Sequence, residues 1–136
     1  MSIHQCRLIR FSQVADPRGN LNIIEGSIHI PFNIARFYYV YNIPSDSHRG
    51  GHAHRELEQL LIPMKGAFDV ILHDGREKKQ FRLDNPDFGL YIPAMIWVDI
   101  KNFTDQSLYL AAVSLHYDEK DYYRNYDEFL QITEKK

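Results

Sequence analysis

Cysteine, long apolar stretches and an excess of charge are all scarce in this sequence of 136 residues. The only cysteine, Cys6, excludes a disulfide within the chain and fits a reducing compartment. No apolar run approaches the roughly 18 residues that a membrane-spanning helix needs. The first residues also lack an apolar stretch of the signal-peptide type. We therefore expect a soluble, cytoplasmic protein that has no membrane partner.

The charge balance and the composition are those of an ordinary globular chain. The formal net charge is only −2, which gives no reason to expect nucleic acid as a partner. Hydrophobic residues make up 44% of the sequence and charged residues 25%, as in a typical soluble domain. The length suits one core, and the sequence contains no repeat or linker. We therefore expect a single domain over residues 1–136.

Short apolar or alternating segments, separated by turn signals, fill the first 116 positions. Asp74-Gly75 between two alternating segments is a strong hairpin signal, and residues 16–19 form another turn sequence. So many short strands at this spacing predict an all-β sandwich or barrel. The expected strands cover residues 6–11, 21–27, 34–43, 57–63, 67–72, 77–83, 88–92, 96–100 and 108–116.

Residues 118–130 change to a helical period. Tyr122, Tyr126, Phe129 and Leu130 recur at helical spacing, and Asp118 is suited to the N-cap position. This pattern predicts one C-terminal helix that packs its aromatic side chains against the domain.

His52 and His54 form the most informative pair in the chain. Residues two apart on a β-strand project from the same face, so both imidazoles should line one wall of a sheet. Two such rings can bind a metal ion or transfer protons near neutral pH. The surrounding residues must decide between these two uses.

The histidine pair lies within a longer pattern, which consists of Gly50, Gly51, His52, His54, Glu58 and Gly66. This pattern resembles the first cupin motif, with one additional residue before the last glycine. Cupins are double-stranded β-helices, or jelly rolls, in agreement with the number of expected strands. We therefore expect an all-β cupin fold with one C-terminal helix.

The second cupin motif, Pro-x-Gly-x-x-His-x-x-x-Asn, is only partly matched by residues 93–102. Asn102 is present, but Val98 occupies the histidine position and cannot bind a metal. His52, His54 and Glu58 would remain as three ligands, which is enough in principle for catalytic zinc. The missing ligand favours proton transfer by the histidines, with Glu58 orienting a ring or facing a cation. We expect no metal and no other cofactor.

Nearly the whole chain resembles the nucleotide-sugar 3,4-ketoisomerases, which are cupins that act on dTDP-4-keto-6-deoxyglucose. Each matching segment is weak alone, but their order and spacing together are specific. The segments are residues 16–19, 30–39, 49–54, 57–59, 89–91, 97 and 117–127.

The resemblance implies an intramolecular oxidoreductase that moves a ketone from sugar C4 to C3 without a metal or a redox cofactor. A base removes the C3 proton, the resulting enediol is reprotonated at C4, and a second group relays the hydroxyl proton. The resemblance assigns His52 and His54 to these roles, with His52 favoured as the carbon base. Tyr39 could hydrogen-bond the sugar oxygens, or it could pack in the core.

The resemblance also implies a dTDP-linked keto sugar as the substrate. Arg49 and Arg36 are candidates for binding the diphosphate, since guanidinium groups pair with phosphate oxygens. Arg18 could lie near the sugar, and Trp97 or Tyr91 could line the pocket. The family further implies a homodimer, in which the N-terminal strand could be exchanged, and a role in deoxyamino-sugar biosynthesis for glycans such as O-antigen or S-layer chains.

Two other functions fit the sequence. One is a metal-dependent or 3,5-epimerase-like cupin, and the other is a non-catalytic domain that binds a sugar nucleotide. The sequence leaves open which histidine is the carbon base and which glycan receives the sugar. Because Val98 follows the tryptophan where relatives often carry His or Arg, the configuration of the product at C4 also stays open.

Overall fold

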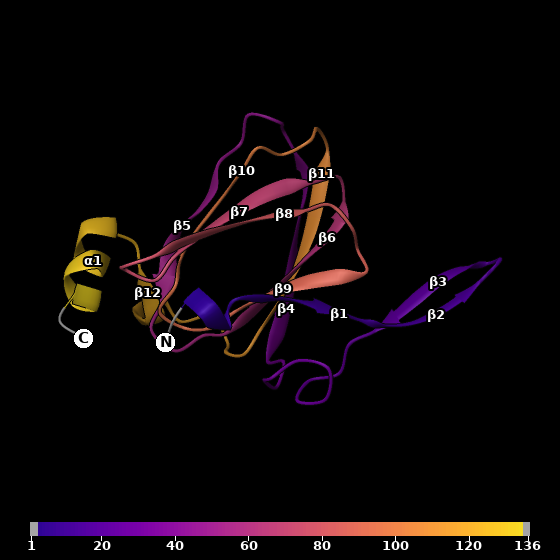
Figure 1. Cartoon of the computed structure of the whole chain (residues 1–136), viewed down its shortest axis with the longest axis horizontal. Helices are drawn as coiled ribbons and strands as arrows, with labels where there is room; N and C mark the ends of the chain where they lie inside the picture. The colour runs from indigo at the N-terminus through magenta and orange to yellow at the C-terminus, as the bar shows by residue number, and fades with distance from the viewer. Residues whose placement is uncertain (1–2, 135–136) are drawn as a thin grey trace.

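The computed structural model describes residues 3–134. Two five-stranded antiparallel sheets face each other and enclose the core (Figure 1). This is the expected cupin-like, all-β fold. The first sheet has the order β1-β9-β6-β11-β4, and its strands are Arg7–Arg10, Phe88–Ile92, Gln59–Lys65, Ser107–Val113 and Arg36–Ile43. The second has the order β12-β5-β10-β7-β8, and its strands are Tyr122–Tyr123, Arg49–His54, Trp97–Lys101, Phe68–His73 and Lys78–Leu83.

Strand alternation determines which side chains enter the space between the sheets. On β10, Val98 and Ile100 belong to the main core, together with Leu61 from the opposite sheet. Trp97 belongs instead to a separate cluster outside the barrel, which includes Phe129 of the C-terminal helix. Val98 and Ile100 therefore face the interior, whereas Trp97 faces the helix.

The N-terminal hairpin projects away from the barrel (Figure 1). Its strands are β2, Ser12–Asp16, and β3, Gly19–Ile23, which are joined by the turn expected at residues 16–19. Strand β2 was not predicted, and the next strand was predicted over residues 21–27, whereas β3 ends at Ile23. Beyond it the chain turns, because the Glu25 carbonyl accepts the N–H groups of Ile28 and His29. Val14 and Leu21 on the hairpin are each 56% exposed.

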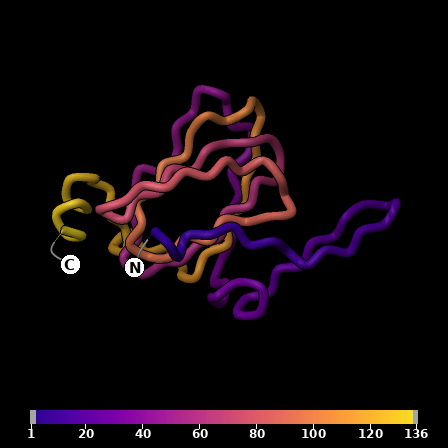
Figure 2. Tube along the Cα trace, viewed as in Figure 1, coloured from indigo at the N-terminus to yellow at the C-terminus, as the bar shows by residue number. Residues whose placement is uncertain are grey.

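The C-terminal segment differs from the single helix predicted over residues 118–130. Asp118 is a cap, as expected, but it caps the short 3₁₀ turn Glu119–Asp121 by accepting a hydrogen bond from the Lys120 N–H. Tyr122–Tyr123 then forms β12, and helix α1 covers Tyr126–Glu134. Asn125 accepts from the Glu128 N–H at 2.9 Å at the start of this helix. Figure 2 shows the helix and the hairpin at opposite ends of the molecule.

In the described part of the chain, no helix has the length and apolar character required to cross a membrane.

Candidate active site

A glycine pair shapes the strand that carries the two histidines. Strand β5 pairs with β10, and the register shifts between Val98 and Asp99, so a bulge lies beside Gly50. Gly50 and Gly51 have φ values of 82° and 76°, which favour glycine. A Cβ at Gly50 would approach the Val98 carbonyl oxygen to 2.5 Å. The two glycines therefore let the backbone come close to β10 and set the direction of the following histidines.

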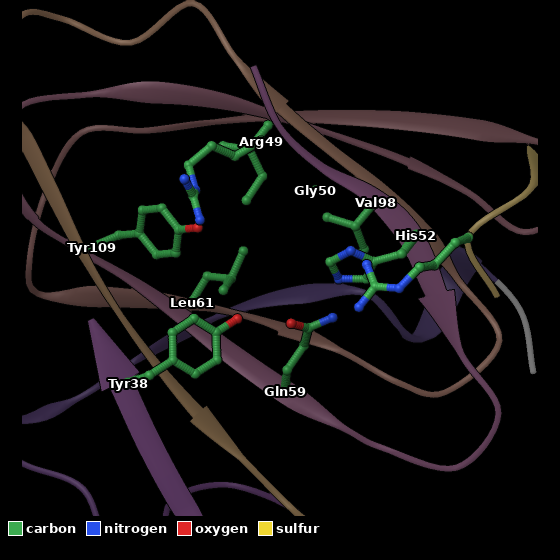
Figure 3. Close-up of a pocket in the computed structure, with 10 residues that line it drawn as sticks. Tyr38, Arg49, Gly50, His52, Gln59, Leu61, Val98 and Tyr109 are labelled. Atoms are coloured by element: carbon green, nitrogen blue, oxygen red, sulfur yellow. The ribbon is translucent and has the colours of Figure 1, made fainter. Parts of the chain in front are cut away.

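The two imidazole rings lie side by side, with 5.1 Å between their centroids. His52 lines a cavity of about 200 Å³ between the sheets. Tyr38, Gln59 and Tyr109 line its opposite wall, and Val98 lies next to His52 (Figure 3). Two cations, Arg49 and Arg124, complete the lining. The cavity therefore combines one histidine with hydroxyl, amide and guanidinium groups.

His54 lies behind His52 and is hydrogen-bonded to a buried carboxylate. Its Nδ1 is 3.0 Å from Oδ2 of Asp121, and the two residues are only 4% and 7% exposed. Asp121 also accepts the backbone N–H groups of Glu56 at 2.9 Å and Leu57 at 3.3 Å. Because an ionised carboxylate only accepts, the neutral His54 ring carries its proton on Nδ1 and keeps its lone pair on Nε2.

Both histidines are held in their neutral form. Burial, together with the nearby His54 and Arg124, lowers the pKa of His52 from 6.5 to about 4. Burial also lowers the pKa of His54, although the hydrogen bond and the charge of Asp121 oppose this shift. A neutral imidazole in a cavity keeps a free lone pair, so His52 is in the protonation state that a general base needs at neutral pH.

Residues 117–124 cover the histidines from the side. Tyr122 pairs with His54 in the strand register, and its ring lies 4.3 Å from His54 and 5.2 Å from His52. Arg124 stacks over the same ring at 4.2 Å. Asp121, Tyr122 and Arg124 were not predicted as site residues, because they lie in the segment predicted to be a helix that packs on the domain. Tyr38, Gln59 and Tyr109 were also not predicted, since only the barrel brings them to the cavity.

Tyr39 lies outside the cavity, so its predicted role in hydrogen-bonding the sugar is corrected. It is 59% exposed on the outer face of β4, whereas its neighbour Tyr38 points into the cavity (Figure 3). The reason is strand alternation, which gives adjacent tyrosines opposite directions.

Tyr91 and Trp97 were predicted to line the pocket, and Glu58 to orient a histidine ring or face a cation, but none of the three lines the cavity. The Tyr91 hydroxyl donates to Glu58 Oε1 at 2.5 Å, and Arg7 stacks on the Tyr91 ring. Trp97 packs against Tyr126 and Phe129 beneath the helix. Glu58 is thus directed away from the histidines. Among residues 3–134, no three His, Cys, Asp or Glu side chains come together as a metal-binding group.

The predicted arginines have three different locations. Arg49 lines the cavity beside Tyr109 (Figure 3). Arg36 donates to the Leu115 carbonyl at 3.2 Å and lies 5.7 Å from the Tyr38 ring, beside the cavity rather than in its lining. Arg18 pairs with Asp16 at the tip of the hairpin, its side chain is 91% exposed, and the hairpin projects away from the barrel (Figure 1).

A cupin barrel that encloses a neutral histidine beside a histidine–aspartate pair defines a protein suited to proton transfer. Comparisons with known proteins identify the family. Residues 4–134 match the family described as "FdtA: WxcM-like, C-terminal". The TDP-4-oxo-6-deoxy-alpha-D-glucose-3,4-oxoisomerase of Aneurinibacillus thermoaerophilus is 38% identical over 129 residues, which are 95% of this chain and 93% of that protein.

A solved structure agrees with this result. A histidine-to-asparagine variant of the 3,4-ketoisomerase QdtA from Thermoanaerobacterium thermosaccharolyticum, in complex with TDP-4-keto-6-deoxyglucose, is 38% identical. The TM-score is 0.94, and the match covers 98% of this chain and 97% of that one. The present chain belongs to the cupin-type dTDP-sugar 3,4-ketoisomerase family.

A more distant structure shares the fold alone. The dTDP-4-dehydrorhamnose 3,5-epimerase of Bacillus anthracis is 14% identical, with a TM-score of 0.77 over 90% of this chain and 79% of that one. The much higher identity to 3,4-ketoisomerases therefore disfavours the 3,5-epimerase-like alternative.

Proposed function

We propose that this protein is an isomerase that moves the keto group of a dTDP-4-keto-6-deoxyhexose from C4 to C3. Membership of the 3,4-ketoisomerase family supports the reaction and the substrate class. The observation that carries the mechanism is the neutral His52 in a cavity, next to a His54 ring held by Asp121.

The reaction needs no change in the overall oxidation state of the sugar. His52 takes the proton from C3, the C3–H electrons form the C3=C4 double bond, and the carbonyl electrons move to the C4 oxygen. Protonation of that oxygen gives the enediol. The C3 hydroxyl then loses its proton while C4 gains one, so that the ketone stands at C3 and the hydroxyl at C4. One proton leaves carbon and one returns, without a redox partner.

His54 is the proposed relay for the hydroxyl protons. Its Nδ1 is occupied by Asp121, so Nε2 is the ring atom that can exchange a proton. The buried carboxylate would stabilise the imidazolium that forms during the transfer. His52 is therefore assigned as the carbon base because it lines the cavity, and His54 as the relay.

Cations near the cavity are suited to the diphosphate of the nucleotide. Arg49 lines the cavity and Arg36 lies beside it, and guanidinium groups bind phosphate oxygens in a bidentate manner. We propose that these two residues bind the diphosphate. The product would enter deoxyamino-sugar biosynthesis in the cytoplasm, for a glycan such as an O-antigen or an S-layer chain.

A homodimer is the proposed assembly, with the N-terminal hairpin contacting the second copy. A two-stranded hairpin is marginally stable alone in water, and its exposed Val14 and Leu21 need cover. The edge strand β4 also exposes Phe37, Tyr39 and Tyr41, by 66%, 59% and 59%. If the hairpin crosses to the second copy, Arg18 can approach the other cavity. Light scattering coupled to size-exclusion chromatography should report twice the chain mass.

The decisive experiment is turnover of dTDP-4-keto-6-deoxyglucose in the presence of a chelator. NMR in deuterated water should detect a 3-keto product and identify the exchanged carbon and the C4 configuration. Loss of activity on chelation would favour a metal-dependent cupin. Binding of dTDP without turnover of this or a related keto sugar would identify a non-catalytic binding domain, and the proposal would be wrong.

A further inference from the structure

Removal of the C3 proton places negative charge on the C4 oxygen before that oxygen is protonated. A positive group fixed next to this oxygen would lower the barrier, because preorganised charges are most effective where charge develops. The inference therefore rests on the proposed function and requires a cation at the end of the cavity that holds His52.

Arg49 and Arg124 both line the cavity, but they belong to different ends of it. Arg49 lies beside Tyr109, across the cavity from His52 (Figure 3). Arg124 stacks on Tyr122, whose ring also contacts His52. The electrostatic effects agree with this division: the charge of Arg124 lowers the pKa of His52, whereas the charge of Arg49 opposes the rise that burial causes in the pKa of Tyr109. Arg124 is therefore the cavity cation nearest in effect to the base.

The Arg124 side chain is held in position by its neighbours. Its Nε and Nη2 donate to the two carboxylate oxygens of Glu119 at 2.5 and 3.0 Å. Tyr117 donates to the same carboxylate at 2.6 Å, and the Tyr122 ring supports the guanidinium plane. Within residues 3–134, the remaining nitrogen, Nη1, has no hydrogen-bond partner. The group is thus oriented from one side and keeps two N–H donors for a ligand.

We propose that Arg124 is a catalytic residue that stabilises the oxyanion at C4 of the enediolate through the N–H groups of Nη1. When His52 takes the C3 proton, the carbonyl electron pair moves to the C4 oxygen, and the guanidinium pairs with the charge. When this oxygen is protonated, the pairing weakens and the enediol continues to the product. Arg124 itself keeps its protons throughout.

The test compares Arg124→Gln and Arg124→Lys with the wild type. An oxyanion role predicts a loss of kcat of about 10²–10³-fold for glutamine, as for other single oxyanion donors, and a smaller loss for lysine. The affinity for dTDP, measured by calorimetry, should change less than about twofold, because the charge acts on the sugar. Added guanidinium ions should partly restore Arg124→Ala. The acid limb of the pH profile should also move to higher pH in the glutamine variant, since a cation near His52 has been removed.

Arg7→Gln is the matched control, because Arg7 also stacks on a tyrosine ring, Tyr91, but lies outside the cavity. Its turnover should equal that of the wild type. Glu119→Gln should lower kcat less than Arg124→Gln, since it loosens the guanidinium without removing it.

Three results would overturn the role of Arg124. One is an active wild type with unchanged kcat in Arg124→Gln, and another is a loss of dTDP affinity with kcat intact, which would identify a diphosphate contact. The third is an equal loss of kcat in Arg7→Gln. A wild type without isomerase activity would overturn both the proposed function and this role, so the two failures are distinguishable.

Discussion

Strand β5 and residues 117–124 form two sides of one site, but they contribute to it in different ways. Strand β5 supplies the two rings proposed to react, His52 and His54, by a spacing that is visible in the sequence. Residues 117–124 supply Asp121, which is hydrogen-bonded to His54, and Arg124, whose charge lowers the pKa of His52. The comparison teaches that the reactive groups are encoded locally, whereas their protonation and orientation come from a distant segment.

The largest decrease in kcat is expected when the ring of the proposed base is removed. His52→Asn keeps a polar side chain but removes the base, so kcat should fall about 10²–10⁴-fold. Deuterium exchange at C3 should slow equally, and dTDP binding should persist. Exchange at the wild-type rate would show that the carbon base lies elsewhere on the cavity wall.

Replacing Asp121, the hydrogen-bond partner of His54 in residues 117–124, should lower kcat by a smaller factor. Asp121→Asn preserves the shape but lets the amide donate to Nδ1, so His54 would lose its tautomer preference. We expect a decrease in kcat of at least about tenfold, with KM little changed. Nitrogen NMR of the His54 ring should detect the altered tautomer, and Asp121→Glu should recover part of the activity. An unchanged tautomer would contradict the role of Asp121.

The burial of both histidines also predicts a pH dependence of stability. The pKa of His52 is lowered from 6.5 to about 4 in the folded state, so between these values the unfolded chain binds more protons than the folded one. Stability should therefore be retained above about pH 6.5 and fall as the pH decreases towards 4. Urea unfolding at several pH values should reveal this fall, and His52→Asn should make it less steep. A pH dependence that the variant leaves unaltered would contradict the lowered pKa.

The smallest expected effects separate two adjacent tyrosines. Tyr38→Phe removes a hydroxyl from the cavity and should lower kcat/KM about two- to tenfold, which is the range of one hydrogen bond. Tyr39→Phe changes the outer face of β4 and should leave kcat/KM unaltered. A larger loss of kcat/KM in Tyr39→Phe than in Tyr38→Phe would contradict the assignment of Tyr38 to the inner face of β4.

The sequence predicted the sheet-rich fold and the paired rings, because period-two alternation and turn residues are local signals. Strand β4 gave no such signal for Tyr39. Both faces of this strand are apolar or aromatic, because its sequence includes Phe37, Tyr38, Tyr39 and Val40. The pattern therefore does not show which of these side chains face inward. Only the position of β4 opposite the histidines assigns Tyr38 to the inside.

The helix prediction over residues 118–130 was wrong for a different reason. Tyr122 and Tyr126 are spaced as on a helix, but Tyr122 pairs with His54 as part of a strand, and the helix begins only at Tyr126. The pairing depends on a contact about 70 residues away in the chain, which no local pattern contains. Asp121 was thus read as part of a helix, although its carboxylate holds a site histidine.

The pairing of β12 with β5 has a consequence for the order in which the molecule loses structure. Strand β12 has two residues and lies at the edge of its sheet, directly before the helix that packs on Trp97. Short edge elements open locally with a lower free energy than the central strands of a barrel. Detachment of this C-terminal unit would release Asp121 and Arg124 while the barrel stays folded. We therefore expect the enzyme to lose activity on warming before its sheets melt.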